Sequence, residues 1–403
     1  MISKTPGVLK IDKNTPQRGK MKLTLLLVSS LTIMSVITIS PALPQMASDF
    51  SEVPRAEFLV KLVLTIPALF IAVVSPIAGR LIDKYGRLRL LWASLVLYVL
   101  AGTGGFYLDD LYAILISRAF LGIAVGMSMT IAITLIADYF EGMERQKFVG
   151  IQIAFMSIGG ILFIGLGGVL ADISWRYPFL LYLFALLVLP LSMMYLPEPS
   201  ISRNQDQTST QAKAPSIIWL LFINTMIMWI LFFLIPVQIP FHMKAIGIEK
   251  NALIGLAIAI STLFSAISSV SYSRIKGKFS FLFIFALGYL LMAIGFALAA
   301  LSQDLFLVIL SMIFLGLGMG IMIPNTNMWV MKLAPPAIRG KEIGKLTTFW
   351  FMGQFLSPII IAPVLTFMTL PDTFMTAAGA LLVLAIVFLT FYMSKSGKQV
   401  EQL

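Results

Sequence analysis

A compact set of charged side chains lies between two long apolar runs, in the short segment from Gly79 to Leu91, which reads G-R-L-I-D-K-Y-G-R-L-R-L-L. Its one carboxylate, Asp83, stands among four cations that include Arg87, so ion pairing is the chemistry that it offers. Gly79 and Gly86 permit close helix approach and a sharp reversal of the chain. The spacing predicts a tight hairpin between two helices, and a short basic loop without further role is the plainer alternative.

A second charged residue stands out because of its surroundings. Arg118 lies inside an apolar stretch, Leu111 to Ala137, that contains no other charged side chain. An unpaired guanidinium at membrane depth is costly, so Arg118 should face other helices or water instead of lipid. Its role is either functional or limited to packing, by pairing with a backbone carbonyl or by reaching outward to the interface.

The sequence lacks the residues that other kinds of active site need. The chain has no Cys and a single His, His242, which excludes a disulfide framework, a thiolate nucleophile and a His/Cys metal site. There is no phosphate-binding loop of the G-x-x-x-x-G-K-[ST] type. None of the long apolar stretches has an Asp or Glu near its middle. We therefore expect that the protein is not an enzyme and that it binds no cofactor and no metal.

The composition is that of an integral membrane protein. Hydrophobic residues make up 59% of the 403, mean hydropathy is +0.95 and only 12% are charged, against about 25% in a soluble domain. The net charge of +11 is spread over many short loops, which argues against nucleic acid as a partner and fits positive-inside topology. Stretches of about 20 apolar residues predict an all-α protein with twelve transmembrane helices: 23–46, 58–82, 88–108, 111–137, 148–171, 177–196, 216–240, 252–272, 279–301, 305–331, 343–369 and 373–393.

A polar segment divides these helices into two sets of six. Residues 197–215 are rich in Ser, Thr and Gln and predict a cytoplasmic linker between an N-terminal bundle, 23–196, and a C-terminal bundle, 216–393. Residues 1–22 and 394–403 are expected to be cytoplasmic tails, because an even number of spans puts both termini on one side. Most of the 29 Lys and Arg fall on that side, which makes it the cytoplasmic one.

The two halves also share a sequence pattern. F-L-G at 120–122 with Gly126 returns as F-L-G at 314–316 with Gly320, in the fourth helix of each half. A nearly constant offset indicates a duplicated six-helix unit, hence two pseudo-symmetric bundles, although small residues can also match by chance.

Gly79, Asp83, Gly86 and Arg87 resemble the loop between helices 2 and 3 of the major facilitator superfamily, whose signature is G-x-L-a-D-r-x-G-r-k. The resemblance implies that Asp83 and Arg87 act as gate residues on the intracellular side, and Asp138 is expected to join them. Leu115, Arg118 and Gly122 are similar to the helix 4 motif l-x-x-R-x-x-x-G. In that family this Arg is linked to proton coupling or substrate charge.

Helix 5 is similar in spacing to the antiporter signature of that family. Gly150, Gly159, Gly167 and Gly168 stand at its positions, but Phe163-Ile164 replaces the Gly-Pro pair. Small residues allow two helices to pack closely, and ordinary packing is the alternative. The stretch from Ile39 to Phe50 looks like the corresponding part of twelve-helix drug:proton antiporters.

The resemblance implies that helices 1, 4, 7 and 10 line a central cavity, with helices 5 and 11 contributing. Met, aromatic and amide side chains there would suit bulky, mostly apolar ligands. The candidate substrate-binding residues are Met34, Ser35, Thr38, Met127, Gln152, Met156, Asn224, Trp229, Asn325, Asn327, Trp350 and Gln354.

These observations favour a secondary transporter that exports an amphiphilic small molecule in exchange for protons. The missing Gly-Pro pair and the lack of a central acid leave open the uptake or facilitated transport of a metabolite or nutrient. The expected partners are a small-molecule substrate, protons and the lipid bilayer. We expect a monomer in a cell membrane, and resemblance favours a bacterial inner membrane.

Overall fold

The computed structural model describes residues 16–199 and 214–394. Most of the expected linker and tails therefore lie outside the described residues, as does the side chain of Asp83. The first half contains α1 (Pro16–Ile37), η1 (Ser40–Ala42), α2 (Leu43–Asp49), α3 (Ala56–Tyr85), α4 (Arg87–Gly102), α5 (Gly104–Tyr107), α6 (Leu111–Tyr139), α7 (Gly142–Ile173), η2 (Tyr177–Leu183) and α8 (Phe184–Tyr195). The second contains α9 (Ile217–Phe232), α10 (Leu234–Ala245), α11 (Asn251–Lys276), α12 (Phe281–Leu301), α13 (Leu305–Leu333), η3 (Pro336–Ile338), α14 (Arg339–Val364) and α15 (Leu370–Met393).

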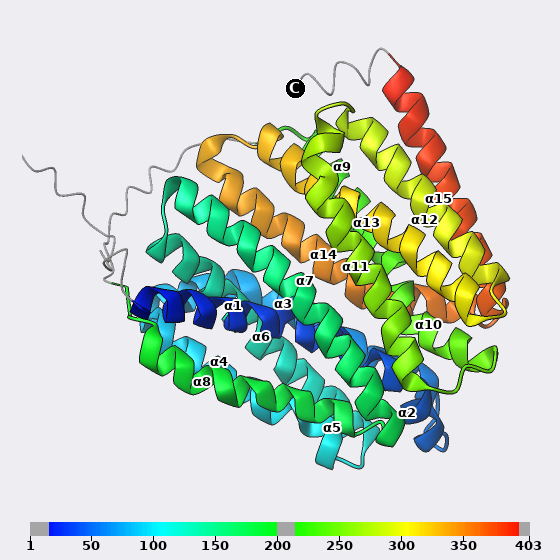
Figure 1. Ribbon diagram of the computed structural model, residues 1–403, viewed down its shortest axis with the longest axis horizontal. Helices are drawn as coiled ribbons and strands as arrows, with labels where there is room; N and C mark the ends of the chain where they lie inside the picture. Colours follow the sequence, from blue (N-terminus) through cyan, green and yellow to red (C-terminus); the bar gives the residue numbers. More distant parts are fainter. Residues whose placement is uncertain (1–15, 200–213, 395–403) are drawn as a thin grey trace, which may run out of the picture.

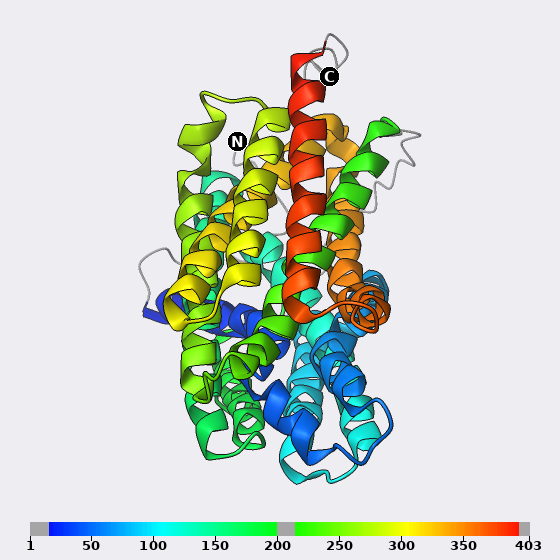
Figure 2. The same cartoon turned by 90° about the vertical axis from the view of Figure 1, so that its right-hand side faces the viewer.

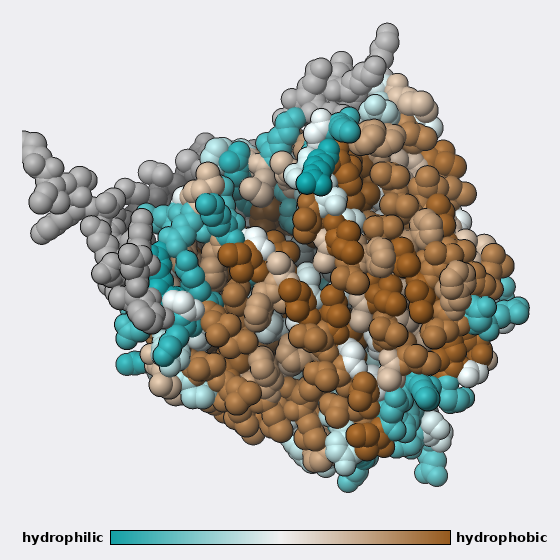
Figure 3. Space-filling model, in the orientation of Figure 1, coloured by the Kyte–Doolittle hydropathy of each residue, from teal (hydrophilic) through white to brown (hydrophobic). Residues whose placement is uncertain are grey.

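These elements form 12 membrane spans, and the described residues contain no strand. The all-α prediction with twelve transmembrane helices is confirmed. Hydrophobic residues cover the middle of the surface and hydrophilic residues gather at its two ends (Figure 3). A hydrocarbon core surrounding the molecule would meet that hydrophobic middle.

Several spans are less regular than the sequence predicted. The predicted single helix 23–46 begins earlier, at Pro16, and breaks after Ile37, because Pro41 and Pro44 lack the N–H groups that would continue it. The predicted span 216–240 is divided between α9 and α10, since Pro236 cannot donate to the carbonyl of Phe232. The spans that start at 88 and 177 are also interrupted, as α4–α5 and as η2–α8.

Glycines at equivalent places explain the sequence repeat. A Cβ atom on Gly122 of α6 would lie 2.5 Å from the carbonyl oxygen of Pro67 in α3. A Cβ atom on Gly316 of α13 would collide with the carbonyl of Ser261 in α11. In each half, therefore, the glycine lets the fourth helix approach the backbone of the second helix. The two six-helix bundles repeat this packing and are pseudo-symmetric.

Within the described residues, the two halves pack together towards one end of the molecule. We call the end where α1 begins and α15 finishes the terminal end, and the opposite end, near α2 and α10, the far end. In Figure 1 the halves converge at the far end and separate towards the terminal end. Figure 2 shows the C-terminal half above the N-terminal half. The molecule therefore has the shape of a V that is open at its terminal end.

Candidate functional site

A cavity of about 670 Å³ lies between the two halves. Its lining comes from α1, α7, α9, α10, α11, α13 and α14, and contains aliphatic, aromatic and hydroxyl side chains but no charged one. Two of the sequence candidates, Trp229 and Gln354, belong to this lining. The arrangement suits an apolar molecule with few polar groups.

Both of these side chains hold a buried polar atom that has no partner among the described residues. The indole Nε1 of Trp229 is an unpaired donor, and the amide Oε1 of Gln354 is an unpaired acceptor. Trp229 also packs against Trp350, with ring centroids 5.6 Å apart. A buried polar atom without a partner is unfavourable. Both atoms are fully buried, so a molecule in the cavity would reach them only if these side chains moved.

The remaining helix 1 and helix 5 candidates lie elsewhere. Gln152 and Met156 line a smaller cavity of about 310 Å³, where Gln152 Nε2 donates to Ser29 Oγ over 2.8 Å. Met34, Ser35 and Thr38 are fully buried. The hydroxyl of Ser35 donates to the carbonyl of Thr32, and the hydroxyl of Thr38 donates to the carbonyl of Met34. These three side chains therefore do not line the cavity.

The other candidates are distributed over the C-terminal half and α6. Asn325 accepts from Tyr272 and donates to the carbonyl of Phe281, so it joins α13 to α11 and α12. Asn224 accepts from Tyr289 Oη over 2.7 Å. Met127, Asn327 and Trp350 are partly buried and line neither of these two cavities.

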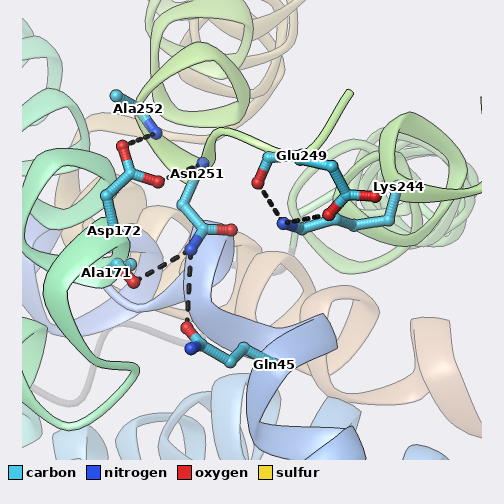
Figure 4. A network of polar contacts seen from close by, with 7 residues as sticks. All are labelled: Gln45, Ala171, Asp172, Lys244, Glu249, Asn251 and Ala252. Carbon is cyan, nitrogen blue, oxygen red and sulfur yellow. Dashed lines mark hydrogen bonds and ion pairs between the residues drawn. The ribbon is translucent and has the colours of Figure 1, made fainter. Parts of the chain in front are cut away.

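Polar contacts at the far end join the two halves (Figure 4). The carboxylate of Asp172, at the end of α7, accepts from the backbone N–H groups of Asn251 and Ala252, at 2.6 and 3.1 Å. Asn251 Nδ2 donates to the carbonyl of Ala171 and to Oε1 of Gln45. An acid of one half therefore caps the N-terminus of α11 in the other, where the helix dipole favours negative charge.

Further contacts strengthen this closure. Ser40 Oγ donates to the carbonyl of Pro236 over 2.5 Å. The ammonium of Lys61 pairs with Glu57 over 2.5 Å and lies 4.6 Å from the ring centre of Phe241 in α10. The far end is closed by hydrogen bonds and by a cation on an aromatic ring.

The four glycines of α7 that match the antiporter spacing, Gly150, Gly159, Gly167 and Gly168, do not share one environment. Cβ atoms on Gly167 and Gly168 would collide with the carbonyl of Thr38 and lie 2.6 Å from that of Asn251. Gly159 has ordinary contacts, and Gly150 has none within 4 Å and lines the cavity. Close packing applies only to the pair at the far end, where Gly168 faces the opposite half.

The predicted loop at the terminal end forms a charge cluster. Arg87 Nε lies 3.2 Å from Asp138 Oδ2. Glu198, which follows α8, accepts from the backbone N–H groups of Arg87 and Leu88 at 2.6 and 2.8 Å and caps α4. Gly86 turns the chain with a φ of 87°. Gly79 and Asp83 lie in the last turns of α3.

Two alanine substitutions in this loop should have opposite effects on stability. Gly86→Ala should lower the free energy of unfolding by about 1–2 kcal/mol, because alanine avoids the left-handed region and its Cβ would lie 3.1 Å from Glu198 Oε1. Gly79→Ala should raise it by up to about 1 kcal/mol, because Gly79 is helical with nothing within 4 Å of a Cβ. Thermal unfolding in detergent measures both, and equal effects would contradict this account of the turn.

Arg118 is completely buried and joins four elements of the N-terminal half. Its Nη2 donates to the carbonyl of Ser35 at 3.0 Å and to Tyr182 Oη at 2.8 Å, and its Nε donates to the carbonyl of Val63 at 3.2 Å. The guanidinium also lies 4.8 Å from the ring centre of Tyr182. No salt bridge to Arg118 occurs in the described part of the chain.

Comparison with known proteins identifies the family to which the chain belongs. A family model described as the Major Facilitator Superfamily matches residues 25–358, with a second match over 243–402. The chain belongs to the Major Facilitator Superfamily. It is a membrane transporter and not an enzyme.

Two relatives show to which members of the superfamily the chain is similar. The bacillibactin exporter of Bacillus subtilis (strain 168) is 25% identical over 354 residues, covering 81% of this chain and 85% of that protein. The quinolone resistance protein NorA of Staphylococcus aureus (strain COL) is 24% identical over 300 residues, 73% and 77% of the two chains. The predicted resemblance to twelve-helix drug exporters of the superfamily is confirmed.

Solved structures of the superfamily share the fold. A D-xylose-proton symporter superposes with a TM-score of 0.74 at 19% identity, covering 92% of this chain and 97% of the other. The nucleoside transporter NupG gives a TM-score of 0.75 at 16% identity, with 92% and 99% coverage. Identities this low support the architecture alone.

Sequence reasoning missed the residues that act between elements. Glu198 was assigned to the linker, and Asp172 and Asn251 were not singled out. The sequence offers only a general signal for these three residues. The N–H groups at the start of a helix need acceptors, and acidic side chains are favoured there, but this does not say which acid reaches which helix. Among residues 16–199 and 214–394, no group of His, Cys, Asp or Glu could hold a metal ion.

Proposed function

We propose that this protein exports amphiphilic, drug-like small molecules by alternating access, in exchange for protons. The observation that carries the proposal is the uncharged cavity of about 670 Å³ between halves that converge at the far end and separate towards the terminal end. The relatives named as a bacillibactin exporter and a quinolone resistance protein support export. Uptake of a metabolite is the alternative that the sequence left open.

The same proposal includes orientation and location. The Lys and Arg of the loop around Gly86 lie at the terminal end, and positive charge favours the cytoplasmic side. We place both termini in the cytoplasm, with the V open inwards, in a monomer in a bacterial inner membrane. The two six-helix bundles joined by the segment 197–215 are the moving units.

Proton coupling requires a group that changes its protonation state. No Asp or Glu lies near the middle of a described span. The candidate carriers are Asp49, His242 and a carboxylate of the gate at the terminal end, Asp83 or Asp138. Of these we propose the gate carboxylate. Asp138 pairs with Arg87, so taking up a proton would weaken that contact.

Proteoliposomes that contain a pH dye provide the test. A panel of neutral drugs, lipophilic cations and small metabolites is added, and we expect one class to elicit a proton flux opposite to its own movement. Asp138→Asn should remove the flux, and Glu52→Gln, an exposed acid at the far end, should leave it unchanged. Accumulation with the proton gradient would establish uptake instead, and transport without proton movement would exclude coupling.

A further inference from the structure

The smaller cavity, of about 310 Å³, differs in charge from the central cavity of about 670 Å³. Its lining comes from α1, α6 and α7 of the N-terminal half (Figure 1). Thr32 and Ile153 line both cavities, so the smaller one is a side chamber of the central one. Of the described residues that line this side chamber, Arg145 alone is charged, whereas the central lining holds no charge.

The guanidinium of Arg145 has no acidic partner within the described part of the chain. The neighbouring acid, Glu144, is already paired with Arg18 Nη2 at 2.6 Å and with Lys22 Nζ at 3.1 Å. Arg145 also lies close to the start of α7, where the helix dipole disfavours a positive charge. The stability of α7 therefore does not explain this arginine.

The duplicated half provides a comparison for this position. R-Q-K-F-V-G at 145–150 returns as R-G-K-E-I-G at 339–344, with the same offset as the F-L-G pattern. In the second copy, Arg339 Nε donates to the carbonyl of Ala334, at the end of α13, over 3.1 Å. The described residues contain no corresponding bond for Arg145, whose side chain borders the side chamber instead. Only the N-terminal copy therefore presents its guanidinium to a cavity.

The rest of the side chamber suits an apolar group. Its walls are mainly aliphatic or methionine side chains, among them Met129, Ile136 and Met156. Gln152 Nε2 is engaged with Ser29 Oγ at 2.8 Å. A guanidinium binds carboxylate, sulfonate and phosphate groups through parallel N–H donors. An amphiphilic anion would thus be matched at both of its ends, and a cation would be repelled with no acid in the lining to receive it.

We propose that the side chamber binds organic anions, with the acidic group paired to Arg145 and the apolar part against Met129 and Met156. A longer molecule reaches the central cavity past Thr32 and Ile153. The inference rests on the proposed transport function and adds a substrate class, amphiphilic anions, that an uncharged central cavity would not select. Soluble organic anions and acidic lipids share this chemistry, and the experiment separates them.

The absence of cysteine allows a protection assay that requires no transport. Met156→Cys places one thiol in the side chamber, and its alkylation by N-ethylmaleimide is followed in phosphatidylcholine nanodiscs. Naphthalene-1-sulfonate should slow this reaction at about tenfold lower concentration than naphthalene-1-sulfonamide, its neutral analogue, because only the sulfonate pairs with the guanidinium. A thiol from Ala266→Cys, in the central lining, should show no such preference. Equal protection of Met156→Cys by both compounds would overturn the proposal.

Variants of the arginine test which charge is responsible. Arg145→Gln should remove the preference for the sulfonate, and Lys147→Gln should leave it unchanged, because Lys147 is an exposed cation of the same helix outside the lining. Arg145→Glu should reverse the preference, so that naphthalen-1-ylmethylammonium protects better than the sulfonate. A reversal of this kind cannot result from misfolding. A preference that survives Arg145→Gln would overturn the site.

The source of the anion is tested by adding phosphatidylglycerol to the nanodiscs. If this lipid alone protects Met156→Cys, and Arg145→Gln removes that protection, the site holds an acidic lipid. If only the sulfonate protects, the site holds soluble anions, and either result supports the pairing with Arg145.

Binding and transport can fail separately. If the sulfonate protects as expected but no compound is exported, the exporter function fails and the site remains. If export proceeds and Arg145→Gln changes neither protection nor preference, the exporter function stands and the anion site fails.

Discussion

Arg118→Met is expected to abolish transport and to destabilise the N-terminal half, although no carboxylate pairs with this arginine in the described part of the chain. The reason lies in the backbone around it. The carbonyl of Val63 stands four residues before Pro67, which has no N–H to offer. Arg118 Nε supplies the missing donor at 3.2 Å.

The Arg118 guanidinium also donates a hydrogen bond at the point where the first span is interrupted. The α1 helix ends at Ile37, so the carbonyl of Ser35 is among those without a regular partner. Arg118 Nη2 donates to it at 3.0 Å. One side chain therefore stabilises two irregular helices. Methionine would leave the carbonyl of Val63 unpaired, at a cost of about 1–3 kcal/mol, whereas the carbonyl of Ser35 would keep its longer contact with Tyr182 Oη at 3.4 Å.

A double-mutant cycle tests this explanation. Pro67→Ala returns an N–H to Val63, so Arg118→Met should cost at least about 1 kcal/mol less in that background. Pro76→Ala, at the other proline inside α3, is the matched control and should show no such coupling. Arg118→Lys should lose transport as well, because one ammonium cannot reach three acceptors. Full activity in the lysine variant would show that charge alone is required.

Gly168→Val is the second substitution with a large expected effect, and it should prevent the far end from closing. Its Cβ would lie 2.6 Å from the carbonyl of Asn251 and 3.2 Å from Cα of Gly255, both backbone atoms that cannot turn aside. Overpacking of this kind costs about 1–3 kcal/mol, which shifts a two-state equilibrium by about 5- to 150-fold. The states open at the far end should then dominate, and transport should stop.

Labelling reports this shift. A cysteine introduced by Gln45→Cys, within the far-end contacts, should react slowly with a membrane-impermeant maleimide when it is the only substitution. It should react rapidly when Gly168→Val is present as well. Gly165→Val is the control, because it lies on the same helix with nothing within 4 Å of a Cβ. Unchanged labelling in a folded Gly168→Val protein would contradict the role of this contact.

The sequence by itself determined the membrane class, the twelve spans, the duplicated bundle and the family. Each depends on local composition or on residues that are close in the chain, such as the loop from Gly79 to Arg87. The breaks in the spans were also local, because proline removes a specific donor. The positions of Pro41 and Pro236 could have predicted them.

Which residues face the cavity was decided only by the tertiary structure. The spans are apolar on all sides, so periodicity carries little information about the side that faces the partner helices. Trp229 and Gln354 line the cavity, whereas Ser35 and Thr38 turn to their own backbone. The cap of Asp172 on Asn251 joins residues far apart in the chain, and it exists only because the halves close at the far end.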